Sequence, residues 1–307
     1  MTLNAIAKYL LTAALCVATL DGTAYPAAAA EIRSFSVSVS GPTAGRQMIL
    51  IPGLMSSGDV WAETAARYAG RYRVHVLTLS GFAGRAPIGG DAFLPVVRDE
   101  LLGYIRAEHL DHPIIVGHSL GGFLAFWIAA TAPDIVGPIV AVDGVPFLAA
   151  LMNPGATSAA MTPQADRMRA MYATLSSSQL GAQSRMSLPT MISEPSNVER
   201  AVAWAAASDP GTVGRVMAEM STTDLREDMP RIHSPVLLIG AAKDAPDADA
   251  LARLTKAYEA QVAKAPHATV VMARRARHFV MMDDPAFFFA ALDAFLDEAP
   301  AAPAKAR

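Results

Sequence analysis

The chain has 307 residues, of which 52% are apolar and 17% charged, so it can build a large core and is too apolar to be disordered. Its formal charge is −3, and no Lys/Arg-rich block of the kind that follows a phosphate backbone occurs, which argues against nucleic-acid binding. The length fits one large domain or two small ones.

The first thirty residues have the pattern of a secretory signal. Lys8 precedes an apolar run at 9–20, which is shorter than the roughly 20 residues that a membrane span needs. Ala28 and Ala30 follow as an A-x-A cleavage site, so we expect residues 1–30 to be removed. The alternative is a membrane anchor. The prediction is an exported protein, periplasmic or secreted, with no stable membrane anchor after cleavage.

Apolar runs and amphipathic runs then alternate along the chain. Strands are predicted at 35–39, 47–51, 74–79, 113–117, 138–143, 235–240 and 268–273. Helices are predicted at 61–68, 92–108, 120–130, 248–263 and 286–296, with Asp91 capping the second and Asp284 and Pro285 opening the last. Most of these strands are continuously apolar, which is typical of a parallel sheet covered on both faces. The pattern predicts an α/β fold with a doubly wound, mostly parallel sheet.

One interval, 144–232, contains no convincing strand. Helical pieces are expected there at 163–175, 197–208 and 211–220. Nine of the 15 methionines fall in this interval, at 152, 161, 168, 171, 186, 191, 217, 220 and 229. Because methionine adapts to varied apolar partners, the interval is interpreted as a helical lid over an apolar pocket, or as a helical subdomain with an adaptable core.

The predicted organisation has four parts. Residues 1–30 form the signal peptide, and 31–143 with 233–299 form the α/β core. The helical lid occupies 144–232, and 300–307 form a flexible tail.

The stretch from Gly117 to Gly121 matches G-x-S-x-G, with Ser119 at its centre. It lies after a predicted strand and before a predicted helix, as in a sharp turn that lifts a serine hydroxyl clear of a sheet at a helix N-terminus. Ser119 is therefore the candidate nucleophile, and the alternative is a serine in an ordinary tight turn.

A serine nucleophile needs a base and an acid. His278 follows the last predicted strand and should emerge at the same sheet edge as Ser119. None of the other six histidines has so suitable a position for the base. Asp244 follows strand 235–240, and its loop leads directly to the strand before His278, so it is the candidate acid. Asp143, which ends strand 138–143, is the reserve acid; otherwise it would satisfy backbone groups at the lid entrance.

An oxyanion would need two backbone N–H donors. Leu120 supplies the N–H that follows the nucleophile. Leu54, after the Pro52-Gly53 turn, would supply the other, although that turn could also be an ordinary one.

The segments "IPGLMSSGDVW", "VGHSLGG", "PVLLIGAAKDAP" and "ARHFVMMDDPAFF" together resemble the α/β-hydrolase superfamily, over roughly 47–296. The resemblance implies a helical lid inserted after the sixth strand of the fold. It also implies Ser119, Asp244 and His278 as catalytic triad, with Leu54 and Leu120 as oxyanion donors. Many relatives have His-Gly where this chain has Pro52-Gly53, which leaves the subfamily open.

The leading hypothesis is a serine hydrolase that cleaves carboxylic esters, lactones or thioesters with an apolar acyl chain. Acyl transfer, amide or peptide hydrolysis and perhydrolysis on the same triad stay open, as does a ligand-binding protein on a hydrolase scaffold. No metal or organic cofactor is expected, since the acidic and histidine residues at 108–112 lack a metal-binding spacing. The sequence does not indicate the oligomeric state.

Overall fold

A computed structural model describes residues 32–298, so the predicted signal peptide 1–30 and the tail 300–307 lie outside the described residues. Seven strands lie at the predicted places. They are β1 (Phe35–Ser40), β2 (Arg46–Ile51), β3 (Tyr72–Leu79), β4 (Ile114–His118), β5 (Ile139–Val142), β6 (Val236–Ala241) and β7 (Ala268–Ala273).

The strands form one sheet in the order β1-β3-β2-β4-β5-β6-β7. β1 is antiparallel to β3, and every other neighbouring pair is parallel. The carboxyl ends of β2, β4, β5, β6 and β7 therefore meet at one edge of the sheet, where ligand sites of doubly wound folds lie. The predicted fold class, a mostly parallel α/β sheet, is confirmed.

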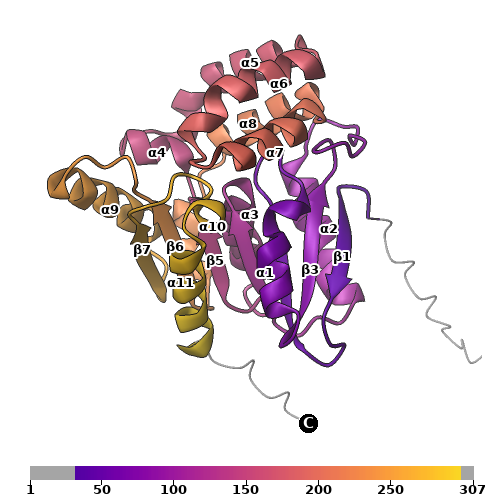
Figure 1. Ribbon diagram of the computed structural model, residues 1–307, viewed down its shortest axis with the longest axis vertical. Coiled ribbons are helices and arrows are strands. Elements are labelled where there is room, and N and C mark those ends of the chain that lie inside the picture. The colour runs from indigo at the N-terminus through magenta and orange to yellow at the C-terminus, as the bar shows by residue number, and fades with distance from the viewer. Residues whose placement is uncertain (1–31, 299–307) are drawn as a thin grey trace, which may run out of the picture.

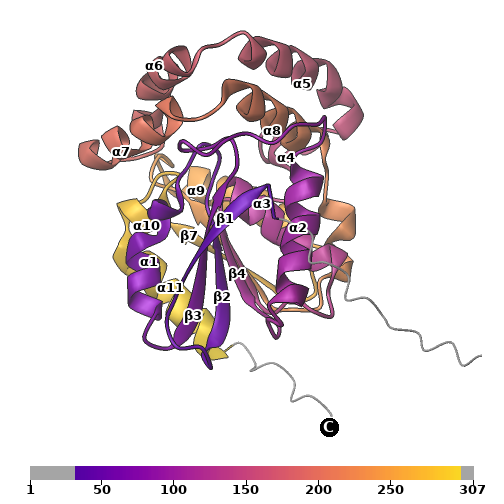
Figure 2. The ribbon, with the colours of Figure 1, turned by 90° about the vertical axis from the view of Figure 1, so that its right-hand side faces the viewer.

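Helices cover both faces of this sheet (Figures 1 and 2). One face carries α1 (Ala62–Tyr68), α10 (Val280–Asp283) and α11 (Pro285–Glu298); the other carries α2 (Leu94–Ala107), α3 (Leu120–Thr131) and α9 (Ala248–Val262). Two apolar cores result, one on each face. Among the described residues, no helix is long and apolar enough to cross a membrane.

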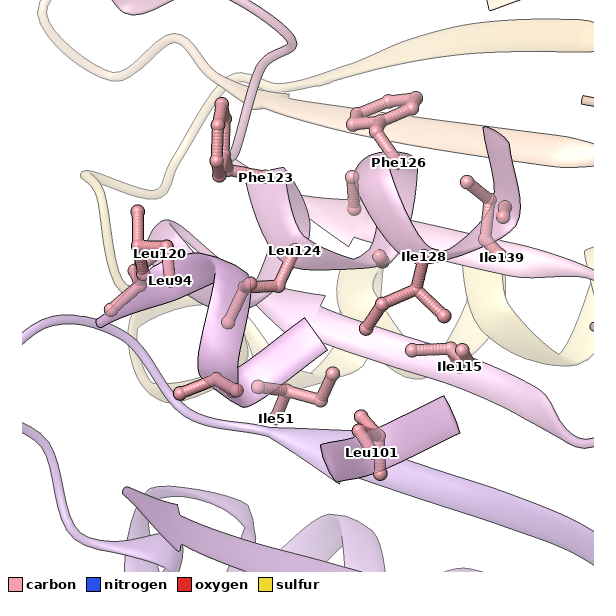
Figure 3. Close-up of a cluster of buried hydrophobic side chains, with 14 of the residues drawn as sticks. Ile51, Leu94, Leu101, Ile115, Leu120, Phe123, Leu124, Phe126, Ile128 and Ile139 are labelled. Carbon is pink, nitrogen blue, oxygen red and sulfur yellow. The ribbon is translucent and has the colours of Figure 1, made fainter. Parts of the chain in front are cut away.

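The helix that follows Ser119, α3, is apolar on all sides, and ten of its twelve residues are buried. Leu124 and Ile128 pack with Ile51, Ile115 and Ile139 from three neighbouring strands (Figure 3). This packing fixes α3 on the sheet, and with it the turn that carries Ser119.

The strandless interval is a helical insertion between β5 and β6. It contains the helices α4 (Leu148–Met152), α5 (Ser158–Ala173), α6 (Ser177–Ser187), α7 (Pro195–Ala206) and α8 (Pro210–Thr222), with short 3₁₀ turns η2 (Leu188–Thr190) and η3 (Arg226–Arg231). Its main helices lie over the carboxyl edge of the sheet (Figures 1 and 2). Counted in this chain, the insertion follows the fifth strand, whereas the family resemblance led us to expect it after the sixth.

The insertion extends both cores of the sheet. Val213 and Val216 of α8 join the core around α2 and α3. Ile192, between η2 and α7, and Val198, in the first turn of α7, join the core around α1 and α11. The methionines of the insertion differ in exposure. Some pack against the core, while Met152 is 87% and Met186 83% exposed. Methionine content alone therefore did not mark a single apolar surface.

The start of α2 differs from the prediction that Asp91 caps it. The two Glu219 carboxylate oxygens, from α8, accept hydrogen bonds from the N–H groups of Phe93 (2.7 Å) and Leu94 (2.6 Å). Asp91 instead pairs with Arg169 at 3.3 Å. A residue distant in sequence thus satisfies the free N–H groups of this helix, which local pattern analysis could not detect.

Candidate functional site

Ser119 stands in a strained turn between β4 and α3, with φ 52° and ψ −114°. Three glycines make room for the turn. A Cβ on Gly117 would lie 2.0 Å from the Gly121 carbonyl oxygen, one on Gly121 would lie 2.2 Å from the Ile51 oxygen, and one on Gly144 would lie 2.3 Å from the Ser119 oxygen. Since such approaches exclude any side chain, the glycines of the motif are required by packing. Non-glycine residues held at positive φ concentrate at functional sites.

The loop between β2 and η1 (Gly58–Trp61) runs beside this turn. A Cβ on Gly53 would lie 3.3 Å from the Ser119 Cβ, so the two backbones are in close approach. Met55 has a positive φ of 59°, which bends the loop directly after Leu54. Leu120 is the first residue of α3, and the first N–H groups of a helix have no partner within it. Leu54 and Leu120 therefore flank Ser119, and their role as oxyanion donors stays a prediction.

His278 lies in the loop after β7 and is held by a carboxylate. Its Nδ1–H donates to Asp143 Oδ2 at 2.5 Å. Asp143 comes directly after β5, has φ 49°, and its side chain is 10% exposed. Its other oxygen, Oδ1, accepts from the Ala241 N–H at 2.8 Å and from the Tyr258 hydroxyl. Both carboxylate oxygens are thus occupied, and the ring of His278 has a fixed orientation.

Electrostatics favour the ionised form of Asp143. Burial alone raises the pKa of its carboxyl, but the hydrogen bond and charge of His278, with the donors Tyr258 and Ala241, outweigh burial and lower the pKa below the usual range. Burial, followed by the charge of Asp143, raises the pKa of Tyr258. Tyr258 therefore keeps its proton and remains a donor.

Asp244 lies elsewhere, so the prediction that it holds His278 is wrong in this structure. Its side chain is 70% exposed and meets Arg277 Nε at 3.5 Å. Asp244 lies three residues beyond the end of β6. Asp143 is the first residue after β5, and β5 is the neighbour of β4, the strand that leads to Ser119. The reserve residue Asp143, not Asp244, makes the contact that the triad requires.

His118 connects the neighbourhoods of Ser119 and His278. The His118 and His278 ring centroids are 4.7 Å apart, and His118 directly precedes Ser119. No hydrogen bond joins the Ser119 hydroxyl to His278 within residues 32–298; such bonds are often long before a substrate binds.

The helical insertion contacts the loop that carries His278. The Phe279 N–H donates to the Met191 carbonyl at 3.2 Å. Asp283 accepts from the Ser193 N–H (2.8 Å), the Ser193 hydroxyl (2.6 Å) and the Arg277 N–H (2.9 Å). The insertion thus bonds directly to Phe279, and it is connected through Asp283 to Arg277; these are the two chain neighbours of His278.

Two residues of the site were not anticipated in these roles. Tyr258 belongs to α9, and no pattern in the sequence relates it to Asp143. His118 was one of the six histidines that suited the role of base less clearly than His278, and the sequence did not indicate which groups it would contact. An "Asp-Gly" pair directly after an apolar strand, as at Asp143 and Gly144, was the available signal for the acid.

No group of three or more His, Cys, Asp or Glu side chains in the described chain is arranged to hold a metal ion.

Proteins with related sequences include a pimeloyl-[acyl-carrier protein] methyl ester esterase of Aliivibrio salmonicida. It is 27% identical over 253 residues, which cover 82% of this chain and 92% of the relative. A second such esterase, of Aliivibrio fischeri, is 26% identical over 192 residues, 62% of this chain and 73% of the relative.

Solved structures match the fold. A hydrolase from Pseudomonas aeruginosa superposes with a TM-score of 0.69 at 20% identity, covering 85% of this chain and 94% of the other. An enol-lactonase from Burkholderia xenovorans has a TM-score of 0.67 at 18% identity, covering 86% and 96%. The family model described as "Alpha/beta hydrolase family" matches residues 48–291, which include most of β2, the strands β3 to β7 and the helical insertion, with Ser119, Asp143 and His278. The chain therefore belongs to the alpha/beta hydrolase family.

Proposed function

We propose that this chain, an ester hydrolase, works through an acyl-enzyme on Ser119, with His278 as base and Asp143 as the acid that orients it. The related esterases support the reaction class. The single observation that carries the assignment is the bond from His278 Nδ1–H to Asp143 Oδ2, because it leaves Nε2 as the nitrogen free to accept a proton.

Each step uses groups that the chain itself supplies. The Ser119 oxygen attacks the ester carbonyl carbon while its proton moves to His278 Nε2. The oxyanion accepts hydrogen bonds from the N–H groups of Leu54 and Leu120. His278 then gives the proton to the leaving alcohol as the carbon–oxygen bond breaks. Water repeats the sequence on the acyl-enzyme, and Ser119 regains its proton.

Asp143 contributes by charge and by position. Its carboxylate stabilises the imidazolium that forms when His278 takes the proton, and it does not itself become protonated. The N–H of Ala241 and the hydroxyl of Tyr258 hold the carboxylate in one orientation.

A fluorophosphonate probe, which reacts with activated serines, tests this assignment. We expect labelling at Ser119, located by peptide mass spectrometry, and no labelling of Ser119→Ala. Ser196→Ala, at the exposed start of α7, serves as a control for the loss of a serine outside the site. A wild-type protein that hydrolyses p-nitrophenyl acetate but carries no label at Ser119 would contradict the assignment.

We further propose that the helical insertion acts as a lid that recognises an apolar acyl chain. Its helices lie over the sheet edge that bears Ser119, and its partly buried Met217 and Met220 pack against the core around α2 and α3. Each buried methylene stabilises by roughly 0.8 kcal/mol, so kcat/KM should rise a few-fold per added CH₂ until the pocket is full. A series of p-nitrophenyl esters of rising chain length measures this, and a flat series would contradict it.

Methyl esters of longer acids are the substrates to test first. The relatives' names describe esterases for the methyl ester of pimeloyl-[acyl-carrier protein], in which pimeloyl is the acyl group and the protein carries it. A small methyl leaving group and a long acyl side agree with a lid that contacts the acyl chain. Hydrolysis of pimelate methyl esters should therefore exceed hydrolysis of acetate esters with the same leaving group.

We propose, finally, that the protein is exported and cleaved near Ala30. The support is the charged residue Lys8, the short apolar run 9–20 and the A-x-A tract, all outside the described residues. Mass spectrometry of the protein from its native host should find a mature N-terminus near Glu31. A retained segment 1–30 would contradict the proposal.

A further inference from the structure

His118 is a buried titratable residue beside the site that the proposed mechanism does not use. His118 ends β4, directly before Ser119, and is 1% exposed. Buried histidines are usually explained by the partners of both ring nitrogens, so the surroundings of each nitrogen decide what this residue does.

One nitrogen of His118 holds the backbone of the proposed base. Nε2 lies 3.1 Å from the His278 carbonyl oxygen. Because a carbonyl only accepts hydrogen bonds, Nε2 must carry the proton, which sets the tautomer. The ring also lies against His278 and Phe279, with centroid distances of 4.7 and 4.5 Å.

The other nitrogen faces the loop after β2. A Cβ on Gly53 would lie 2.7 Å from His118 Nδ1, so only a glycine at 53 leaves space for the ring. Nδ1 has no hydrogen-bond partner and is shielded from solvent. The ring therefore fills the space between the loop of Leu54 and the loop of His278.

The charge state of His118 follows from this enclosure. Burial, with the nearby charge of His278, lowers its pKa to about 3, although Asp143 acts in the opposite direction. The ring of His118 is thus neutral near neutral pH. A neutral ring 4.7 Å from His278 does not repel the imidazolium that forms during acyl transfer.

We propose that His118 is a positioning residue for the ester-hydrolysis site, which fixes the backbone of His278 through its Nε2–H and spaces the His278 loop from the oxyanion loop. This inference rests on the proposed function of Ser119 and His278. His118 takes no proton in the proposed mechanism, and it acts through the position of His278.

Two variants of similar length separate the hydrogen bond from simple filling of space. His118→Gln keeps an N–H donor near the position of Nε2, whereas His118→Met has none. With p-nitrophenyl acetate, we expect His118→Met to lower kcat about 10- to 100-fold with KM within about twofold, since small displacements of catalytic groups have effects of this size. His118→Gln should recover most of kcat. A role in stability alone would lower the melting temperature of both variants and leave kcat per folded molecule unchanged.

A measurement on the wild type stands even if a variant fails to fold. Long-range ¹⁵N–¹H spectra should show His118 as the neutral Nε2–H tautomer, without titration, between about pH 5 and 8, where an unperturbed histidine titrates. An Nδ1–H tautomer, a titration in that range, or equal kcat for folded Gln and Met variants would overturn the inference. If wild-type Ser119 itself carries no fluorophosphonate label, it is the proposed function that fails.

Discussion

Two neighbouring strand ends, those of β5 and β6, each present an aspartate at the carboxyl edge of the sheet. Asp143 is 10% exposed on its side chain and has three hydrogen-bond donors around its carboxylate. Asp244 is 70% exposed on its side chain and has one distant ion-pair partner, Arg277. The two aspartates have nearly the same position in the topology of the sheet. Burial of the carboxylate and the hydrogen-bond donors around it, rather than strand order, therefore distinguish an orienting acid from a surface carboxylate.

The same contrast has an electrostatic side. A buried carboxylate near an imidazole interacts with it in a medium that screens poorly, while an exposed ion pair contributes about 0–1 kcal/mol. Asp143 can therefore hold and stabilise a charged His278, and Asp244 cannot. The predictions below each change one side of this comparison, from the largest expected effect to the smallest.

Replacing Asp143 should have the largest effect. Asp143→Asn keeps the shape but removes the charge that orients His278, so we expect kcat to fall roughly 10⁴-fold, as is known for a triad aspartate. Steady-state kinetics with p-nitrophenyl acetate measure it, with circular dichroism as the check of folding. A folded Asp143→Asn protein with more than a tenth of wild-type kcat would contradict the assignment.

Tyr258→Phe removes one donor from Asp143 Oδ1 and leaves its Ala241 partner. A hydrogen bond to a charged group contributes about 1.5–3 kcal/mol, so kcat should fall roughly 10- to 100-fold. The control is Tyr172→Phe, because within residues 32–298 no hydrogen bond joins the Tyr172 hydroxyl to Asp143 or His278. Equal kcat for the two variants would show that Asp143 does not depend on Tyr258.

Acid sensitivity gives a second measure of the same contact. The folded-state pKa of Asp143 is depressed, so its contribution to stability is present above the unfolded value of about 3.9 and is lost as pH falls through the lower folded value. Tyr258→Phe removes a donor that lowers this pKa, so acid unfolding should begin at a higher pH than in the wild type. Acid titration followed by circular dichroism measures the midpoint; an unchanged midpoint would contradict the role of Tyr258.

The junction between the insertion and the His278 loop should give a smaller effect. Ser193→Ala removes the hydroxyl that Asp283 accepts from and that Lys243 Nζ donates to at 2.7 Å. Because the Ser193 backbone N–H remains on Asp283, we expect only about a three- to tenfold fall in kcat, within the range of a single neutral hydrogen bond. Ser196→Ala, on the exposed start of α7, is the matched control and should match the wild type.

Asp244→Asn should have the smallest effect, within about twofold on kcat, because it disturbs only an exposed ion pair. This variant is the direct counterpart of Asp143→Asn. A loss of several orders of magnitude here would reverse the comparison and return the acid role to Asp244.

Much of this molecule could be predicted from its sequence. Continuous apolar strands and the helices between them predicted the order of elements, and Gly117 and Gly121 marked the turn at Ser119, because these signals are local. His278 could be located because it follows the last strand. In each case the informative residues lie within a few positions of the element they specify.

The remaining features depend on contacts between distant segments. Asp143 and Asp244 follow adjacent parallel strands, and only the three-dimensional path of each loop decides which side chain meets His278. Tyr258 reaches Asp143 from 115 residues away, and Glu219 caps α2 from 125 and 126 residues away. Hydrophobic periodicity carries no information on such polar contacts.

The proton between His278 and its carboxylate tests the central claim most directly. In the wild type, ¹H NMR should show a strongly downfield resonance, assigned through ¹⁵N to His278 Nδ1–H, from the short bond to Asp143. We predict that Asp244→Asn keeps this resonance and that Asp143→Asn loses it while the protein stays folded. Loss in Asp244→Asn with retention in Asp143→Asn would contradict the account.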